Sequence, residues 1–378
     1  MRRFTGTFAG VALLALVAGC LGDDTPAQPT TTTTTTSYVG QTRTYWIAAD
    51  DVVWDYAPTG INQITGQPFD DVANVFVQNG PDRIGKVYIK ALYREYTENF
   101  RNRKTHPANL GTLGPVIRAV VGDTIVVNFK NNTQFPASIH PHGVFYDKAN
   151  EGAPYNDGTS GAAKADDAVP PGGTYTYRWA VPERAGPGPA DGSSVFWMYH
   201  SHTDEVADTY TGLMGPMVVT GAGKGKSDGS PADVDVELFT MFMVIDENQS
   251  HYLQRNIDTF AGDPGSVDPE DDGFIESNLM HSINGYVFGN LPGLTMRKGQ
   301  RVRWNLMGMG TEVDLHTPHW HGNTVLVNGA RKDVVELLPA TLLVADMKPD
   351  DVGTWLYHCH VGDHILAGML ALYRVNNP

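Results

Sequence analysis

At 378 residues the chain exceeds one typical domain and is long enough to form two hydrophobic cores. Its 41 Gly and 24 Pro, with many Val, Thr and Tyr, favour strands joined by turns and argue against a helical protein. The formal net charge of −15 argues against a nucleic-acid partner; attraction of cations and plain solubility outside a cell are both reasons for such a charge.

The N-terminus has the layout of an export signal. Arg2 and Arg3 precede an apolar run from Val11 to Val17, and Ala18-Gly19-Cys20 follows it. The run is shorter than the roughly 20 apolar residues that span a membrane. We therefore predict a lipoprotein-like signal segment at residues 1–20, with Cys20 as the candidate lipid anchor. The mature protein is then extracellular or periplasmic, and it meets a membrane only through that anchor.

A polar segment at residues 21–40 follows the signal. It contains an unbroken Thr run from Thr30 to Thr36 and cannot bury a core. We predict a disordered linker here and no catalytic residue.

The remaining chain contains two similar halves. Apolar runs flank a Gly-Asp turn within Gly114–Phe129, and a similar arrangement with a Gly-Gln turn lies within Leu294–Leu306. Each copy is followed by a His-rich loop and, further on, by a second His pair before a Gly and Met segment. This duplication predicts two similar β domains, at residues 41–222 and 232–378.

Four His-x-His pairs stand at matching points of the two halves. Nitrogen ligands select Cu, Zn, Fe or Ni over Mg or Ca, so eight imidazoles suit a cluster of such metals. One pair alone is a weak signal, whereas four pairs, two in each half, are a strong one. The pairs are His140 and His142, His200 and His202, His319 and His321, and His358 and His360.

The last His pair encloses a thiol. Cys359 is followed by His364 and Met369, and His316 precedes the third pair. Cys, His and Met together describe a blue-copper site. Side chains alternate along a strand, so Cys359 points one way and its two His neighbours point the other way. One strand end therefore serves two metal centres, and copper is the predicted metal because zinc does not explain the sulfur ligands.

These motifs resemble those of multicopper oxidases over nearly the whole of both halves. The second half is most similar to the C-terminal domain of ceruloplasmin and hephaestin, in Asp246-Glu247-Asn248, Ile283-Asn284-Gly285 and the two His-rich loops. The resemblance implies an all-β fold of two cupredoxin-like Greek-key β domains, with four coppers per chain. It implies type 1 copper at His316, Cys359, His364 and Met369, type 2 copper at His140 and His319, and a type 3 pair at His142, His200, His202, His321, His358 and His360.

One position departs from the blue-copper pattern. Ser201 in the first half matches Cys359, and a hydroxyl cannot replace a thiolate, so we expect no type 1 copper there. The family places the trinuclear cluster between a first-type and a last-type domain, and two domains in one chain do not readily close such a ring. The resemblance therefore implies a cyclic homotrimer in which neighbouring chains each supply four histidines to a cluster.

The resemblance also implies a reaction: one-electron oxidation of a donor at type 1 copper, coupled to four-electron reduction of O2 to water. The backbone at Cys359 is then the path for electrons. Glu151 follows His142 where related oxidases carry an acid facing the cluster, so it is the candidate proton donor; the alternative is an ordinary loop carboxylate.

The donor is predicted to be Fe(II). Glu276, His281 and Asp363 match residues that resemble the iron-oxidising site of ceruloplasmin, and two carboxylates with one imidazole suit this ion. The alternative is a surface acid, a packed imidazole and a carboxylate that only orients His364.

Three other functions stay open. A laccase-like oxidase of phenols or Cu(I) has the same copper ligands. A copper nitrite reductase is also a two-domain cupredoxin trimer, but it carries its Cys ligand in the first domain, where this chain has Ser201. A copper-storage or electron-carrier protein needs no trinuclear set.

Overall fold

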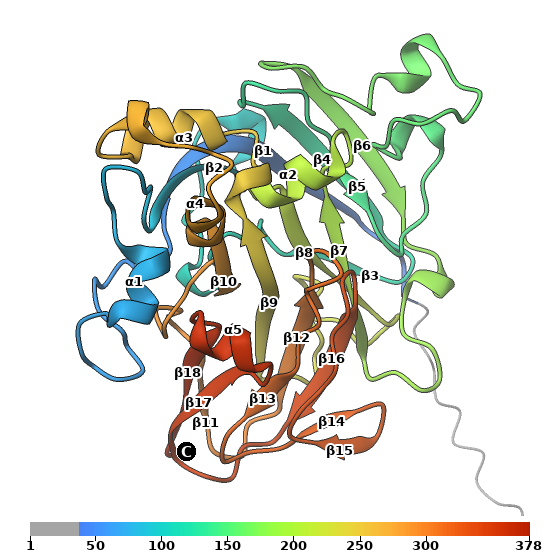
Figure 1. The fold of residues 1–378 in the computed structure, drawn as a ribbon. Coiled ribbons are helices and arrows are strands. Elements are labelled where there is room, and N and C mark those ends of the chain that lie inside the picture. The colour runs from blue at the N-terminus through green and yellow to red at the C-terminus, as the bar shows by residue number, and fades with distance from the viewer. Residues whose placement is uncertain (1–37) are drawn as a thin grey trace, which may run out of the picture. The chain divides into compact units, whose positions relative to one another are not determined.

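The computed structural model describes residues 38–378 of the protein (Figure 1). The predicted signal segment, Cys20 and the Thr run lie outside the described residues. Residues 38–378 form one unit, so the division into domains at 41–222 and 232–378 stays a prediction. Within this part of the chain, no helix combines the length and the apolar character that a membrane span requires.

The first half forms two four-stranded sheets, with the strand orders β2-β1-β4-β6 and β3-β8-β7-β5. The pair β1 and β4 in the first sheet and the pair β3 and β8 in the second are parallel, and the other pairs are antiparallel. Branched and aromatic residues alternate with polar ones in β6, which gives it one buried face. The strands are β1 (Thr42–Asp55), β2 (Val87–Glu95), β3 (Ile117–Val120), β4 (Thr124–Asn131), β5 (His140–Pro141), β6 (Thr174–Ala180), β7 (Ser194–His200) and β8 (Met214–Thr220).

The second half forms a six-stranded sheet, β10-β9-β12-β16-β14-β15, and a four-stranded sheet, β11-β18-β17-β13. Every residue of β12 is buried, because this strand is covered on both faces. The strands are β9 (Val236–Asp246), β10 (Leu279–Ile283), β11 (Thr295–Arg297), β12 (Val302–Gly308), β13 (Pro318–Trp320), β14 (Val325–Val327), β15 (Ala330–Lys332), β16 (Leu342–Met347), β17 (Gly353–Cys359) and β18 (Leu370–Asn376).

The four sheets confirm the predicted all-β class, and the two halves repeat one topology. The parallel pairs β1 and β4, and β3 and β8, correspond to β9 and β12, and to β11 and β18. The predicted turns at Gly122-Asp123 and Gly299-Gln300 are present, but neither closes a hairpin. Each turn instead carries the chain from one sheet to the other, since β3 and β4, like β11 and β12, belong to different sheets.

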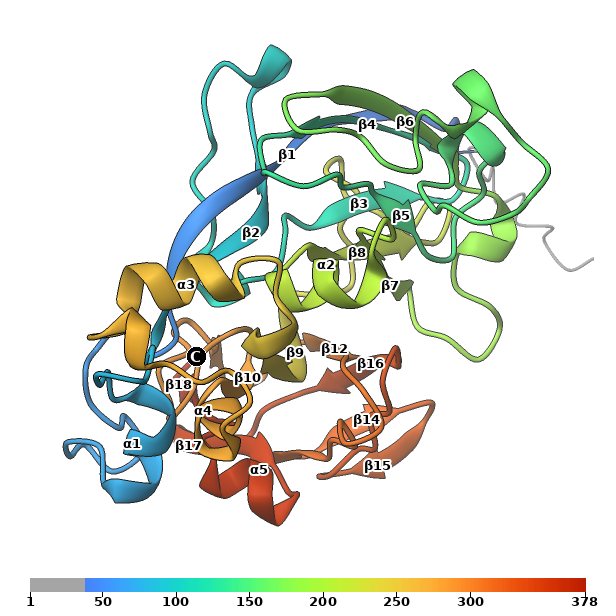
Figure 2. The ribbon, with the colours of Figure 1, turned by 45° about the horizontal axis from the view of Figure 1, so that its top comes forward.

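Short helices cover the ends and edges of the sheets. Helix α4 contacts α1, and α3 contacts β2, so helices of the second half pack on elements of the first half (Figure 2). The helices are α1 (Asp71–Val77), α2 (Glu205–Thr211), α3 (Leu253–Phe260), α4 (Asp272–Ser277) and α5 (Gly362–Leu366).

One hydrophobic cluster joins the two halves and is rich in methionine. Phe196 and Val218 from the first half meet Phe239 and Ile245 from the second half there. Methionine is flexible and polarisable, so it fills the irregular space between two curved sheets. The buried methionines of this cluster are Met198, Met214, Met241, Met243, Met280, Met307 and Met309.

A buried ion pair also joins the halves. Lys90 Nζ of the first half donates to Glu247 Oε1 of the second half at 2.5 Å, and both side chains are fully buried. Lys90 also donates to the carbonyl of Tyr210 at 2.8 Å, and the Tyr56 hydroxyl donates to Glu247. Burial lowers the pKa of Lys90 and raises the pKa of Glu247, and their mutual attraction opposes both shifts.

We predict that Glu247→Ala lowers the free energy of unfolding by about 3–5 kcal/mol, because it leaves the Lys90 ammonium buried without a carboxylate. The measurement is denaturant unfolding followed by tryptophan fluorescence. The double substitution Lys90→Met with Glu247→Leu is the control, since an apolar pair of similar volume is often neutral. A Glu247→Ala protein within about 1 kcal/mol of the wild type would contradict the prediction.

Candidate metal centres

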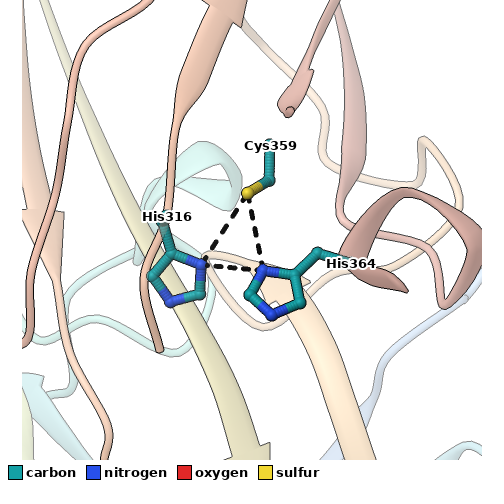
Figure 3. A group of neighbouring side chains, drawn as sticks. All are labelled: His316, Cys359 and His364. Atoms are coloured by element: carbon teal, nitrogen blue, oxygen red, sulfur yellow. Dashed lines mark hydrogen bonds between the residues drawn. The ribbon is translucent and has the colours of Figure 1, made fainter. Parts of the chain in front are cut away.

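Three side chains of the second half converge on one point in the structure (Figure 3). Strand β17 ends at Cys359, helix α5 carries His364, and His316 lies just before β13. Cys359 Sγ lies 3.5 Å from His364 Nδ1 and 4.0 Å from His316 Nδ1, and the two nitrogens are 3.2 Å apart. All three residues are buried.

The thiol in this group is prepared for metal binding. Burial alone raises its pKa, but hydrogen bonds from His316 and His364 and from the N–H of Thr317 outweigh burial and lower the pKa of Cys359 to about 6. The Thr317 N–H lies 3.3 Å from Sγ. A thiolate with two imidazole nitrogens is the donor set that copper prefers, so these residues fit the ion.

Met369 lies beside this group. Its carbonyl accepts from the Cys359 N–H at 3.1 Å, and its N–H donates to the carbonyl of His364 at 2.8 Å. The side chain is fully buried in the same hydrophobic cluster as Cys359. The structure therefore brings together all four residues predicted for type 1 copper.

Asp314 orients His316, although we did not predict this role from the sequence. His316 Nε2 lies 3.0 Å from Asp314 Oδ1, and both groups are buried. Burial opposes the charged form of His316, but the Asp314 carboxylate and the Cys359 sulfur together outweigh burial and raise the pKa of the imidazole. With Nε2 held by the carboxylate, Nδ1 faces the sulfur. In an extended segment, residues two apart point to the same side, so an Asp two residues before a candidate ligand could have been predicted to contact it.

Four histidines of the first half form one group. His140 and His200 are directly opposite each other in the pairing of β5 with β7. His142 Nε2 lies 3.1 Å from His200 Nε2. The ring of His140 lies 5.3 Å from the ring of His202, centroid to centroid.

Four histidines of the second half form a matching group. His319 and His358 are directly opposite each other in the pairing of β13 with β17. His321 Nε2 lies 3.1 Å from His358 Nε2, and the ring centroids of His319 and His360 are 5.3 Å apart. The ligand atoms of His319, His321 and His358 all lie within 4.8 Å of one another.

The two groups remain separate within one chain. Among residues 38–378, every contact between the rings of these eight histidines stays within its own group of four. One chain therefore presents two half-sets of imidazoles.

A tryptophan packs against each half-set at the same place. The glycines after His142 and His321 have φ of +75° and +73°. A Cβ on Gly143 would lie 2.3 Å from the ring of Trp197, and a Cβ on Gly322 would lie 2.5 Å from Trp355. Only glycine allows this close approach, which fixes the loop that carries the second histidine of each pair.

Matching hydrogen bonds identify the first-half counterpart of the sulfur-containing group. Ser138 N donates to Ser201 Oγ at 3.0 Å, as Thr317 N does to Cys359 Sγ. Ser201 N donates to the carbonyl of Leu213, as Cys359 N does to that of Met369. The counterpart of Met369 is therefore Leu213, whose side chain carries no sulfur.

The remaining counterparts are also poor copper ligands. Ala137 bridges to Val169 as His316 bridges to Leu337, and Asp208 accepts from the Leu213 N–H as His364 accepts from the Met369 N–H. Asp208 is fully buried and has its own partners: the Ser201 hydroxyl at 2.5 Å and His251 Nε2 at 2.9 Å. The positions equivalent to His316, Cys359, His364 and Met369 thus hold Ala137, Ser201, Asp208 and Leu213.

Glu151 lies beside the first half-set, but its backbone makes the contact. His140 Nδ1 lies 2.7 Å from the Glu151 carbonyl oxygen. The carboxylate instead binds Lys148 at 2.6 Å and the Tyr155 hydroxyl at 3.0 Å. Its role as proton donor stays a prediction.

The three residues predicted for iron lie on neighbouring elements. His281 is buried on β10, and its ring centroid lies 5.3 Å from that of His364. Glu276 on α4 and Asp363 on α5 are exposed. The convergent ligand groups of residues 38–378 include neither carboxylate, so this set also stays a prediction.

The solved structures similar to this chain share its fold. A multicopper oxidase structure aligns with a TM-score of 0.54 and 16% identity, over 89% of this chain and 88% of the other. A second, titled multicopper oxidase mgLAC, aligns with a TM-score of 0.55 and 18% identity, over 89% and 86%. These likenesses confirm the cupredoxin-like fold.

Sequence relatives are more similar over a shorter share of their length. Human hephaestin is 48% identical over 343 residues, which are 89% of this chain and 30% of that protein. Human ferroxidase HEPHL1 is 48% identical over 340 residues, covering 89% and 29%, and human ceruloplasmin is 44% identical over 346 residues, covering 88% and 32%. The chain thus spans about a third of the length of the curated relatives that it matches.

Two profiles described as multicopper oxidase match residues 93–224 and 265–378, and so contain both half-sets and the Cys359 group. With the fold and the relatives, these matches identify the chain as a member of the multicopper oxidase family.

Proposed function

We propose that the chain is an oxidase that takes electrons singly from Fe(II) and delivers four of them to O2. The overall reaction is 4 Fe(II) + O2 + 4 H⁺ → 4 Fe(III) + 2 H2O. The observation that carries the proposal is the end of β17, where Cys359 belongs to one group of converging ligands and His358, its chain neighbour, belongs to another. Bound copper would supply the one-electron couple and the site of oxygen reduction.

The residues have distinct tasks in this proposal. His316, Cys359, His364 and Met369 hold the copper that accepts electrons from the donor. The backbone from His358 to His360 links that position covalently to the second half-set. The Nδ1 atoms of His200 and His358 lie 3.0 and 2.6 Å from the carbonyls of Ser201 and Cys359, which fixes both rings before metal binds.

Fe(II) as the donor is supported by His281. Burial lowers the pKa of this imidazole to about 4, so the ring is neutral at pH 7. Its Nδ1 lies 2.9 Å from the carbonyl of Leu279, which leaves Nε2 as the ligand atom. A donor ion held by His281 with Glu276 and Asp363 would then lie one ring contact from His364. The name of the human relative ferroxidase HEPHL1 agrees with this donor.

A ring of three chains is the proposed assembly, in which the first half-set of one chain faces the second half-set of the next. The separation of the half-sets within one chain supports it. Exposed apolar side chains lie close in sequence to the first half-set: Phe145, three residues after His142, is 54% exposed, and Val206, four residues after His202, is 52% exposed. Exposed apolar groups near an incomplete site are typical of an interface.

The thiolate of Cys359 is the group on which the blue copper depends. Cys359→Ser should abolish the intense blue absorption and lower copper content from four to three per chain, because a hydroxyl does not replace the thiolate. Ser201→Cys is the matched variant in the first half. It should create no second blue band, since Ala137, Asp208 and Leu213 provide neither imidazole nor thioether. Absorption spectra and copper analysis measure both, and a new blue band in Ser201→Cys would contradict this account.

The identity of the donor can be tested by comparing substrates. Oxygen uptake by the copper-loaded protein should be faster with Fe(II) than with Cu(I) or a phenol. Glu276→Ala and His281→Ala should each lower Fe(II) turnover about tenfold or more, equal to at least about 1.4 kcal/mol of lost stabilisation, and leave phenol oxidation unchanged. Glu270→Ala, which removes an exposed acid nearby in the chain, is the control. Brisk phenol oxidation with unchanged Fe(II) turnover in both variants would favour the laccase-like alternative.

The proposed trimer can be tested at Val206. Val206→Asp should dissociate the trimer and abolish oxygen reduction, because a charge replaces an apolar contact beside the first half-set. The blue absorption should persist, since its ligands come from one chain. Sedimentation velocity measures the assembly, and Val72→Asp on α1, which is equally exposed at 52%, is the control. A monomer that holds four coppers and reduces oxygen would overturn the proposed ring.

A further inference from the structure

A buried carboxylate contacts the peptide group that holds His140. The carbonyl of Glu151 lies 2.7 Å from His140 Nδ1. The N–H of the same peptide group, which belongs to Gly152, donates to Asp166 Oδ2 at 2.8 Å. Asp166, the Glu151–Gly152 peptide and His140 therefore form one continuous chain of hydrogen bonds.

The direction of these hydrogen bonds fixes the tautomer of His140. A carbonyl oxygen only accepts, so Nδ1 of His140 must carry the hydrogen. Nε2 is then the lone-pair atom that is free for a metal. A negative charge at the N–H end of a peptide polarises it and strengthens the carbonyl as an acceptor at the other end.

The surroundings of Asp166 hold this arrangement in place. Asp166 is fully buried, and among the described residues its Oδ1 has no hydrogen-bond partner. Burial raises the pKa of Asp166, and the Gly152 N–H opposes that shift by stabilising the anion. Gly152 has φ of +71°, and a Cβ there would lie 2.6 Å from the carbonyl of Ile139, so only glycine brings this peptide so close to the His140 strand.

The second half has no counterpart of this chain of hydrogen bonds. The residue that matches His140 by strand register is His319, and its Nδ1 is buried without a hydrogen-bond partner in the described part of the chain. The two histidines proposed for type 2 copper therefore differ: Nδ1 of His140 is held by a hydrogen bond, whereas Nδ1 of His319 has no partner among the described residues and its Nε2 lies 3.8 Å from Asp333 Oδ2.

We infer that Asp166 is a positioning residue for His140 and acts through the Glu151–Gly152 peptide. Its carboxylate holds the imidazole with Nε2 free toward the first half-set. The inference rests on the proposed function only in taking His140 as a copper ligand. Asp166 itself touches neither metal nor oxygen.

The test uses the copper-loaded protein and chelator competition, with type 2 copper followed by its electron paramagnetic resonance signal. Asp166→Ala should lose type 2 copper at a chelator concentration about 10–100-fold lower than the wild type, the usual effect of removing a partner of a ligating histidine. Asp166→Asn keeps the shape and an acceptor oxygen but not the charge. It should show a smaller loss and altered hyperfine splitting. The blue absorption of the second half should stay unchanged and reports that the variants fold.

Asp167→Asn is the matched control, because this neighbouring carboxylate binds Lys164 and has no contact with the Glu151–Gly152 peptide. Wild-type affinity in Asp166→Ala would overturn the inference. So would an Asp166→Asn protein identical to the wild type, since packing alone would then explain the position. His140→Ala tests the proposed function separately from the role of Asp166. If this variant keeps type 2 copper, His140 is not a ligand, whatever the result for Asp166.

Discussion

The alternation of side chains at the end of β17 is the constraint on which the copper chemistry depends. Cys359 faces the core of its own half, with His316 and His364, whereas His358 faces His319 and His321. Because two neighbouring residues of an extended chain point to opposite sides, two centres are separated by one backbone segment without any extra element. The strand pairing of β13 with β17 then sets the distance between the histidines that face each other.

The first half has the same fold as the second half but lacks the residues of the sulfur-containing group, so it shows which features come from the fold alone. The first half repeats the strand pairing, the turn between sheets and the histidine half-set, yet its core position holds Ser201 and Asp208. Hydrogen bonds from Ser138 and to Leu213 keep their places although the ligands are gone. The fold therefore fixes the positions, and in the proposed function four side chains decide whether a position binds copper.

Local patterns in the sequence were sufficient to predict the β class and the repeated arrangement of the histidine pairs, because alternation and turn residues are local properties. They did not give contacts that join distant segments. The hydrogen bond from the Ser201 N–H to the carbonyl of Leu213 puts Leu213 at the place of Met369, and spacing alone did not assign that place. Asp166 lies far along the chain from His140, and the contact runs through a third segment, so no local pattern reveals it. The carboxylate of Glu151 is turned toward Lys148, which depends on a loop that periodicity does not describe.

The methionine-rich cluster between the halves has a chemical cost. A thioether becomes a polar sulfoxide on reaction with peroxide, and a sulfoxide in this buried cluster would disrupt the packing between the halves. The cluster is buried away from water, and Met280 and Met307 are fully buried. Because these thioethers are buried, peroxide in solution reaches them only when the two halves separate, so the packing that joins the halves also shields their sulfur atoms from oxidation.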